Sequence, residues 1–476
     1  MAYPRVASLK THDDFVSHLR DSDIEMPSDA EVESGDASPL AQSFEVHGQT
    51  VGNRWSILPM EGWDGTTDGL PTDLTRRRWR NFGLSGAKLI WGGEAVAVRH
   101  DGRANPNQLL LTNKNLSAIE SLRQELVDEH ESHFGRSDDL LVGLQLTHSG
   151  RFSRPNIKSL TEPRTVQRNV VLDRRVKITD DSAIFTDDEL STLIDDFIAA
   201  AVRAEKAGYR FVDVKHCHGY LGHELLAGRE RTGKFGGSFE NRTRFLRDIV
   251  SGIEAATNDL KIGVRLSLFD FLPFHPGADR VGEPEPGGEP NKVFGGGEDG
   301  LTIDMTETSK LVDLMHEIGI RMICTTAGSP YTNPHIQRPA YFPPSDGYTP
   351  PEDPLAGVAR QIAAVAEMKK KHPEMIFIGS GYTYLQDYLP NVAQAVVKAG
   401  MADSIGLGRM VLSYPDLPAD VTAGTVWQRK KVCRTFSDCT TAPRNGIISG
   451  CYPLDPFYKK RDERKQLNDL KKALQA

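Results

Sequence analysis

The chain has 476 residues, with 57 Lys or Arg against 65 Asp or Glu, which gives a formal net charge of −8 at pH 7. These charges are spread along the sequence, so no basic face is available to neutralise phosphates, and we expect no nucleic-acid partner. Apolar residues make up 38% of the chain, which is ordinary for a globular protein and excludes global disorder.

Targeting and redox signals are weak. No apolar run approaches the roughly 20 residues that cross a bilayer, and the opening residues MAYPRVASLK contain no hydrophobic signal region. The five Cys are few and odd in number, which is typical of reduced thiols. We therefore expect a soluble, cytoplasmic protein without a membrane partner.

Short β-branched runs alternate with helical stretches along the chain. The stretch 186–208 has apolar residues at helical spacing, and its Thr186 and Glu189 form a capping box. Strands that alternate with helices predict a parallel sheet. The number of strands and their near-continuous apolar character favour an α/β fold of the closed (β/α)8 TIM-barrel type over an open doubly wound sheet. The expected strands are 53–60, 88–98, 140–146, 209–217, 261–268, 320–328, 374–381 and 402–408.

Three regions are expected along the chain. Residues 1–50 form an N-terminal lead-in that is acidic and extended from residue 23, residues 51–420 form the barrel, and residues 421–476 form a C-terminal extension that packs on the barrel or on a partner subunit. Two long loops follow strands five and six. The Gly/Pro/acidic loop 271–300 is interpreted as a surface insertion, and the aromatic loop 329–354 as a wall of a pocket.

Titratable side chains gather where the fourth strand ends. Lys215, His216, His218 and Tyr220 lie within six residues. Such a cluster at a barrel rim suits acid–base catalysis, although His clusters also bind zinc or serve structural roles.

The stretch HCHGYL (216–221), followed by KFGGSFENRTRFL (234–246), resembles the signature of the old yellow enzyme family. In that family a strand-end His, then His or Asn and Gly-Tyr-Leu, precede a YGGSxENRxRF segment. The resemblance covers most of the chain and looks nearest to the branch of 2,4-dienoyl-CoA reductase and trimethylamine dehydrogenase. It implies a barrel that binds FMN and takes electrons from diffusing NADH or NADPH.

Other strand ends resemble the family's FMN-binding positions. Gln145 offers a donor and an acceptor to the pyrimidine edge, Arg265 supplies a cation that stabilises reduced flavin, and strand-end glycines with Arg409 suit the phosphate. The residues that the resemblance places at the cofactor are Pro59, Met60, Glu61, Ala95, Gln145, Arg265, Gly379, Ser380, Gly381, Tyr382, Gly408 and Arg409.

The resemblance also implies a reaction. Tyr220 would protonate a small-molecule substrate while Lys215 and His218 hold its carbonyl or other electron-withdrawing oxygen. The predicted enzyme is an FMN-dependent oxidoreductase, ene-reductase-like, that passes hydride from NAD(P)H to an activated alkene. Trp63 is expected to line the substrate pocket, and strand alternation points His216 away from the flavin, so we interpret it as structural. Homo-oligomerisation stays open.

The chain departs from the family at two places. Lys215 stands where His is usual, and its charge would favour a more anionic substrate, unless an ion pair with a carboxylate such as Glu61 makes it structural. Cys433, Cys439 and Cys451 are three thiols where the iron–sulfur branch has four, so we expect no cluster and no bound metal, with a three-Cys zinc site as the alternative. Because no GxGxxG follows a strand, we also expect no appended nucleotide-binding domain.

Two other functions stay open. One is the oxidation of an amine or alcohol, as in trimethylamine dehydrogenase. The other is a flavin-free barrel in which Lys215 forms a Schiff base with its substrate. Gln145, Arg265 and the paired GSG and GLGR stretches argue against the latter, because Schiff-base chemistry does not require them.

Overall fold

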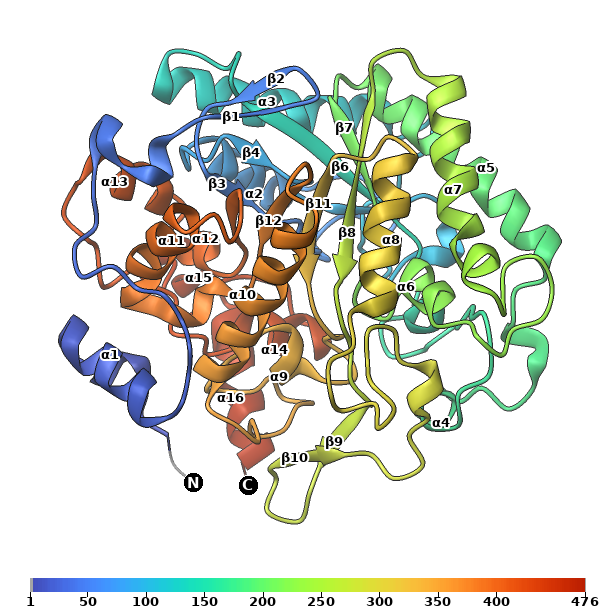
Figure 1. Ribbon diagram of the computed structural model, residues 1–476. Coiled ribbons are helices and arrows are strands. Elements are labelled where there is room, and N and C mark those ends of the chain that lie inside the picture. The colour runs from blue at the N-terminus through green and yellow to red at the C-terminus, as the bar shows by residue number, and fades with distance from the viewer. Residues whose placement is uncertain (1–2, 476) are drawn as a thin grey trace.

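A closed barrel of parallel strands occupies the centre of the molecule (Figure 1). The computed structural model describes residues 3–475. The strands follow the order β4-β3-β13-β12-β11-β8-β7-β6-β5, and a further pairing of β4 with β6 closes the sheet. The barrel strands are β3 (Trp55–Ile57), β4 (Leu89–Ile90), β5 (Ala95–Ala97), β6 (Leu141–Thr147), β7 (Phe211–Val214), β8 (Lys261–Ser267), β11 (Met322–Thr326), β12 (Ile376–Gly379) and β13 (Ser404–Leu407).

The predicted (β/α)8 barrel is confirmed, and all eight expected strands are present. The second expected strand is divided into β4 and β5 around Gly92 and Gly93, where Gly93 has a φ of 47° that extended backbone does not adopt. The near-continuous apolar character of the strands has a simple cause. Every residue of β6 is buried, because one face lines the barrel interior and the other packs under helices.

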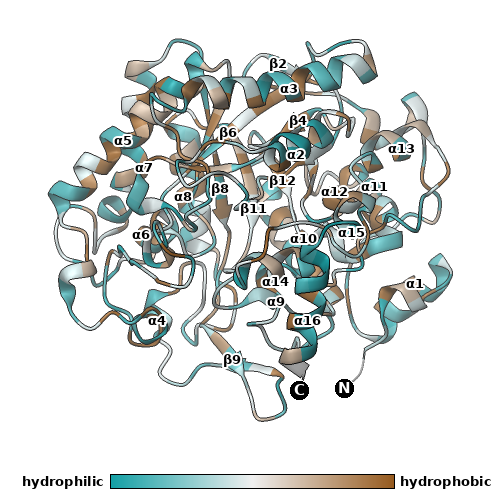
Figure 2. Ribbon diagram, turned by 180° about the vertical axis from the view of Figure 1, so that it is seen from behind, coloured by the Kyte–Doolittle hydropathy of each residue, from teal (hydrophilic) through white to brown (hydrophobic). Residues whose placement is uncertain are grey.

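Helices surround the barrel, with their polar faces outward and the apolar strands inside (Figure 2). The pairs α2–α3 and α5–α7 pack side by side. The helices are α1 (His12–Asp21), α2 (Asp73–Gly83), α3 (Leu116–Phe134), α4 (Val170–Val176), α5 (Asp187–Lys206), α6 (Leu221–Leu226), α7 (Phe239–Ala256), α8 (Thr306–Glu317), α9 (Pro334–Gln337), α10 (Pro354–Lys371), α11 (Leu389–Lys398), α12 (Met410–Ser413), α13 (Leu417–Ala423), α14 (Asp438–Arg444), α15 (Pro456–Lys459) and α16 (Glu463–Gln475).

A hairpin closes one end of the barrel. β1 (Phe44–Val46) and β2 (Gln49–Val51) pair antiparallel, at the top of Figure 1. Phe44, Val46 and Val51 share an apolar cluster with residues that begin barrel strands, such as Leu141 and Phe211. The hairpin therefore plugs the N-terminal mouth of the barrel, and it crosses the expected boundary at residue 50.

The acidic lead-in is extended and lies along α11. The backbone N–H of Asp29 donates to the carbonyl of Asn391 at 3.2 Å, and that of Glu33 donates to Gln394 Oε1 at 2.8 Å. Lys398 Nζ lies 3.1 Å from an Asp29 oxygen and 3.4 Å from a Glu33 oxygen. The acidic residues thus attach the segment to a helix of the barrel.

The opposite end of the barrel collects the long loops. The loop after β8 carries a small hairpin, β9 (Phe274–Pro276) with β10 (Gly282–Pro284), and it lies at the same end as α9, α14 and α16 (Figure 1). This is the end at which (β/α)8 enzymes build their sites.

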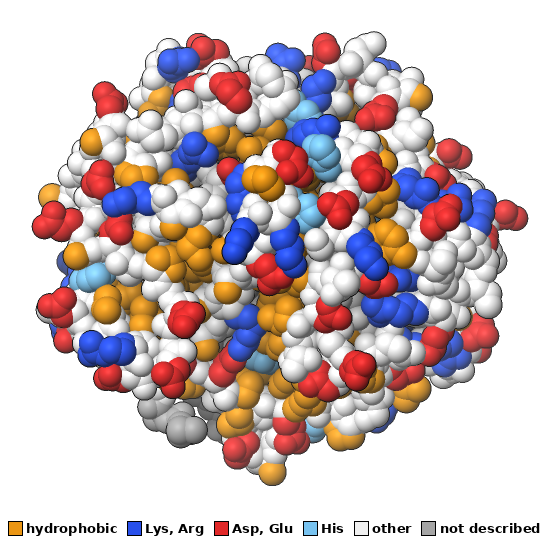
Figure 3. Space-filling view, viewed as in Figure 1, with side chains coloured by type: hydrophobic (Ala, Val, Ile, Leu, Met, Phe, Trp, Pro, Cys, Tyr) orange, Lys and Arg blue, Asp and Glu red, His pale blue; other side chains and the backbone are white. Residues whose placement is uncertain are grey.

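The surface carries charges of both signs. Basic and acidic side chains are interspersed over the face shown in Figure 3. Within residues 3–475, no helix combines the length and the apolar character needed to cross a bilayer.

Candidate active site

A single cavity at the C-terminal end of the barrel brings most of the predicted site residues together. It is walled by strand ends, by the loop after β11 and by the C-terminal extension. The predicted residues that line it are Pro59, Met60, Glu61, Trp63, Gln145, Lys215, His218, Tyr220, Arg265, Ser380, Gly381, Gly408 and Arg409.

Three predicted cofactor residues lie outside the lining of this cavity. Ala95 is paired with Gln145 across β5 and β6, and its carbonyl accepts from Gln108 Nε2 at 2.9 Å. A Cβ on Gly379 would lie 2.5 Å from the hydroxyl of Tyr382, whose side chain is buried. Gly379 and Tyr382 therefore pack against each other at the end of β12.

Glu61 is the centre of a polar cluster at one end of the cavity. Its Oε1 accepts from Lys215 Nζ at 2.9 Å, and its Oε2 accepts from the hydroxyl of Tyr220 and from Trp63 Nε1, each at 3.0 Å. The Lys215 side chain is 4% exposed and that of Glu61 12% exposed. The ion pair considered from the sequence is thus formed, and Glu61 contacts the catalytic candidates.

The phenol of Tyr220 has two further neighbours. Lys215 Nζ lies 3.7 Å from the centroid of its ring, and its hydroxyl lies 3.0 Å from that of Tyr331. Burial and the nearby Glu61 raise the pKa of Tyr220 well above its ordinary value, so the phenol keeps its proton at neutral pH. A carboxylate only accepts, so Tyr220 donates to Glu61 and Tyr331 donates to Tyr220.

His218 sits in a left-handed backbone conformation, with φ 66°, directly before Gly219. Its Nε2 lies 3.2 Å from Thr326 Oγ1 and 3.3 Å from Gln337 Nε2. Burial, with the charges of Arg265 and Lys215, lowers the pKa of His218 well below its ordinary value. The imidazole is therefore neutral and can exchange a hydrogen bond with a ligand in the cavity.

His216, by contrast, lies outside the cavity. Its Nδ1 is 2.9 Å from the carbonyl oxygen of Val214, and burial lowers its pKa to about 4. Its backbone N–H donates to the carbonyl of Arg265 at 2.9 Å, so His216 contacts the site through the backbone, and its structural role stays a prediction.

The buried carboxyl of Asp213 orients Gln145 and Arg265. Asp213 Oδ2 accepts from Gln145 Nε2 at 2.5 Å and from Trp91 Nε1 at 2.8 Å, and its Oδ1 accepts from the backbone N–H of Arg265 at 2.6 Å. Gln145 therefore keeps one N–H and its carbonyl oxygen for a ligand. Arg265 donates to the carbonyl of Pro59 at 3.3 Å, and its buried Nε has no partner within residues 3–475.

This donor set fits the group that the sequence implies. The donor and acceptor of Gln145 suit the imide edge of a flavin, and Arg265 offers an unpaired N–H with a positive charge. At the other end of the cavity, Arg409 and the glycine-containing turns after β12 and β13 suit a phosphate. The residues present therefore fit FMN.

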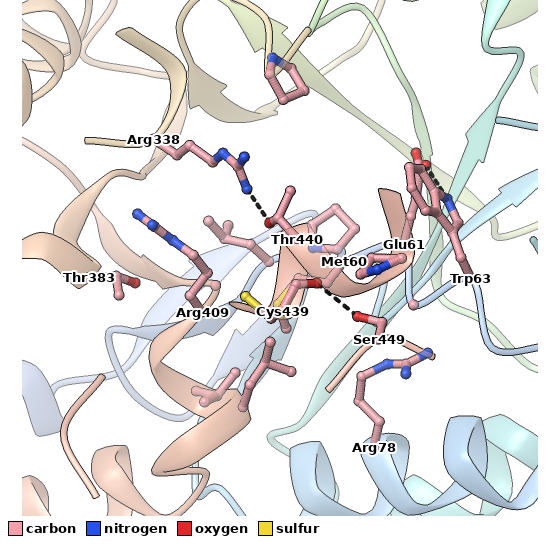
Figure 4. Close-up of a pocket in the computed structure, with 18 of the residues that line it drawn as sticks. Met60, Glu61, Trp63, Arg78, Arg338, Thr383, Arg409, Cys439, Thr440 and Ser449 are labelled. Carbon is pink, nitrogen blue, oxygen red and sulfur yellow. Dashed lines mark hydrogen bonds between the residues drawn. The ribbon is translucent and has the colours of Figure 1, made fainter. Parts of the chain in front are cut away.

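Sequence reasoning missed the part that the C-terminal extension plays. Cys439, Thr440, Pro443 and Arg444 of α14 line the cavity, and Figure 4 shows Cys439 and Thr440 between the two ends of the pocket. Asp213 and Tyr331 were also missed, although Tyr331 belongs to the aromatic loop that was expected to be a wall. Their contacts join residues far apart in the sequence, which strand patterns do not reveal.

The thiols of the extension are unpaired. Cys433, Cys439 and Cys451 are free, and burial raises the pKa of Cys433 to about 11. Phe436, which lies between Cys433 and Cys439 in the sequence, packs on Phe342 with ring centroids 5.5 Å apart. No group of three or more His, Cys, Asp or Glu among the described residues is arranged to hold a metal ion.

Related proteins match this chain in sequence. It is 29% identical over 238 residues to an NADPH dehydrogenase of Halalkalibacterium halodurans, covering 49% of this chain and 64% of the relative. It is 27% identical over 263 residues to an NADH:flavin oxidoreductase of Gibberella zeae, covering 52% of this chain and 60% of the relative. The matches thus span less than two thirds of these relatives.

Solved structures share the fold. A 2-naphthoyl-CoA reductase has a TM-score of 0.63 at 18% identity, over 88% of this chain and 57% of that chain. Histamine dehydrogenase from Rhizobium sp. 4-9 has a TM-score of 0.62 at 18% identity, over 88% and 53%. Morphinone reductase has a TM-score of 0.55 at 20% identity, over 83% and 92%.

The sequence model of one protein family matches half of the chain. The family described as NADH:flavin oxidoreductase / NADH oxidase, whose members use FMN, matches residues 40–282. This range runs from the hairpin through β8 and includes Glu61, Gln145, Lys215, Tyr220 and Arg265. The chain belongs to the NADH:flavin oxidoreductase / NADH oxidase family of FMN-dependent oxidoreductases.

Proposed function

We propose that this protein is an NAD(P)H-dependent FMN oxidoreductase that reduces an alkene activated by a neighbouring oxygen. One observation carries the proposal. Lys215, His218 and Tyr220 open onto the same cavity as Gln145 and Arg265, so the acid–base groups face the residues that fit the flavin. When bound, FMN supplies the means to take hydride from NADH or NADPH and to pass it to a substrate carbon.

The oxygen of the substrate would be held by His218 and Lys215. The neutral imidazole of His218 offers a hydrogen bond, and the ammonium of Lys215 has further N–H groups beside the one directed at Glu61. Both hydrogen bonds stabilise the negative charge that develops on the carbonyl oxygen when hydride adds to the β-carbon of the alkene. Because Glu61 neutralises Lys215, the pair has no net charge, and Lys215 alone does not select an anionic substrate.

Tyr220 would supply the proton to the α-carbon. The transfer leaves a phenolate, which the carboxylate of Glu61 disfavours and which the O–H of Tyr331 and the ammonium of Lys215 over the ring stabilise. The hydride from the nicotinamide and the proton from Tyr220 together account for the two hydrogens that the alkene gains.

The Schiff-base alternative is disfavoured by the same contacts. A Schiff base requires an amine that is free to attack a carbonyl, whereas Lys215 Nζ is engaged in an ion pair with Glu61 at 2.9 Å. The oxidation of an amine or alcohol uses the same flavin geometry, and the experiment below separates it from alkene reduction.

The test is an absorbance spectrum of the purified protein, followed under anaerobic conditions by the addition of NADH or NADPH and then of an enone. We expect flavin bands that bleach with a nicotinamide and return with the enone. Bands that bleach only with an amine or alcohol would establish the oxidative alternative. A colourless protein that takes up no added FMN would refute both.

A further inference from the structure

A second, smaller cavity lies beside α4 and α6, at the same end of the barrel as the main cavity (Figure 1). It has a volume of about 60 Å³ and shares no lining residue with the main cavity. Gly219 lines it, whereas the neighbouring His218 and Tyr220 line the main cavity. The two cavities therefore lie on opposite sides of this segment.

The side chain of Asp270 brings a carboxylate to the second cavity. Its Oδ1 accepts from the backbone N–H of Phe271 at 2.8 Å and from Asn333 Nδ2 at 2.7 Å, whereas its Oδ2 accepts no hydrogen bond within residues 3–475. His223 Nδ1, 4.0 Å from Oδ2, accepts from the backbone N–H of Gly219 and so carries no proton. Burial raises the pKa of Asp270 to about 6, so the carboxylate is charged at neutral pH.

The cations that line this cavity are bound to other carboxylates. Arg151 Nη2 lies 2.5 Å from Glu224 Oε1, and Lys292 Nζ lies 2.6 Å from Glu289 Oε1. In the part of the chain that the structure describes, neither cation forms an ion pair with Asp270. A buried charge without a partner is costly, so the cavity favours a ligand that carries a positive charge.

Three residues that line the cavity each have a buried polar atom without a partner among the described residues. Two of these atoms are acceptors, Gln167 Oε1 and Glu224 Oε2, and one is His223 Nε2, which carries the proton that Nδ1 lacks. Gln167 is 6% exposed and His223 4% exposed. Buried polar atoms of this kind take their hydrogen bonds from a ligand or from ordered water.

The chemistry of the walls narrows the choice of ligand. Within residues 3–475 no group of His, Cys, Asp or Glu is arranged to hold a metal ion. A primary ammonium has three N–H donors, which match the free oxygens of Asp270, Gln167 and Glu224. The phenyl rings suit its alkyl carbons and attract its charge. The apolar residues that line the cavity are Phe152, Leu172, Phe271, Val293 and Phe294.

We propose that this cavity binds a small primary alkylammonium, which pairs with Asp270 and donates to Gln167 and Glu224. The site lies outside the flavin cavity, and the inference does not depend on the proposed function. A neutral ligand fits less well, because it leaves the carboxylate of Asp270 without a counter-charge.

The test is a calorimetric titration of the flavin-saturated protein with ethylammonium, and with ethanol as its uncharged counterpart, at neutral pH. We expect saturable binding of ethylammonium and none of ethanol. Asp270→Asn keeps the shape of the side chain and removes its charge, so the affinity should fall roughly tenfold or more. Asp279→Asn, at an exposed position of the same loop, is the matched control and should leave the affinity unchanged.

The pH dependence tests the site in the wild type, without any substitution. The pKa of Asp270 is about 6, whereas burial lowers that of His223 to about 3. Affinity for ethylammonium should therefore fall as the pH is lowered through about 6, because protonation of Asp270 removes the charge that holds the ligand. The other charged groups that line the cavity form ion pairs with one another, and they are Arg151, Glu224, Glu289 and Lys292.

Three outcomes would overturn the proposal. An absence of saturable binding would show that the cavity holds water only. Binding that Asp270→Asn leaves unchanged would show that the amine binds elsewhere, and an accompanying change in flavin absorbance would identify the main cavity. Thermal unfolding checks that both variants fold. Should Asp270→Asn fail to fold, a wild-type affinity that is equal on both sides of pH 6 would refute the site.

Discussion

Replacement of Glu61 by Gln tests the polar cluster most directly. The change keeps the shape of the side chain but leaves the Lys215 ammonium, 4% exposed, without its counter-charge. Removal of one partner from a buried ion pair costs about 3 to 5 kcal/mol. The ring of Tyr220, 3.7 Å from Lys215 Nζ, still attracts the cation, so the lower end of this range is expected. We predict a loss of about 3 kcal/mol in the free energy of unfolding.

A double-mutant cycle measures how much of this loss comes from the pair of Glu61 and Lys215. Lys215→Met alone should lower the free energy of unfolding by about 2 kcal/mol, because Glu61 keeps Tyr220 and Trp63 as donors. In Glu61→Gln with Lys215→Met no charge is left unpaired, so the double variant should be more stable than the sum of the single losses by about 2 kcal/mol.

Urea unfolding of the four proteins at saturating FMN, followed by circular dichroism, measures the cycle. Glu120→Gln, on the outside of the barrel in α3, serves as a control for the loss of a carboxylate. If the two single losses add within about 0.5 kcal/mol, the side chains do not interact and the reasoning fails.

Three further changes test other parts of the structure. Tyr331→Phe removes the donor to Tyr220, so reoxidation of the flavin by substrate should slow about tenfold. Reduction by NAD(P)H should keep its rate, and stopped-flow traces measure both steps. Equal slowing of both steps would contradict the assignment. Asp270→Asn tests a carboxyl whose pKa burial raises from 3.8 to about 6. Because the folded pKa exceeds the unfolded one, the free energy of unfolding of the wild type should fall by up to about 3 kcal/mol relative to that of the variant as the pH rises through about 6. A difference between the thermal melts of the two proteins that does not change with pH would refute this. Phe44→Ala should lower the free energy of unfolding in urea by about 3 to 4 kcal/mol, because it opens a cavity under the hairpin. A loss below about 1 kcal/mol would show that the hairpin does not plug the barrel.

The barrel could be predicted because its signals are local. Each strand is a short apolar run, and Lys215, His218 and Tyr220 follow one strand end within six residues, so their approach needs no long-range information. The sequence did not predict the division of the second strand at Gly93, because a single left-handed residue does not interrupt the apolar pattern.

The rest of the site depends on contacts across the chain. Glu61 meets Tyr220 over 159 positions and Tyr331 meets Tyr220 over 111, and neither pairing leaves a trace in local composition. The resemblance to a family supplied the strand-end residues but not their partners. The sequence therefore predicted most of the side chains that line the cavity and named Glu61 as a candidate partner of Lys215. The hydrogen bonds of Tyr220 with Glu61 and Tyr331 emerged only from the fold.

The C-terminal extension illustrates the limit of motif reasoning. Its three thiols drew attention to metal chemistry, yet its contribution to the cavity comes from residues that no motif marks. Thr440 fixes the guanidinium of Arg338, and Arg444 bonds to the carbonyl of Pro330 beside Tyr331. Both contacts reach the loop after β11, one at Arg338 and one at Pro330. The extension thus fixes the loop at both ends of the cavity, so its length and packing matter to the site independently of any metal.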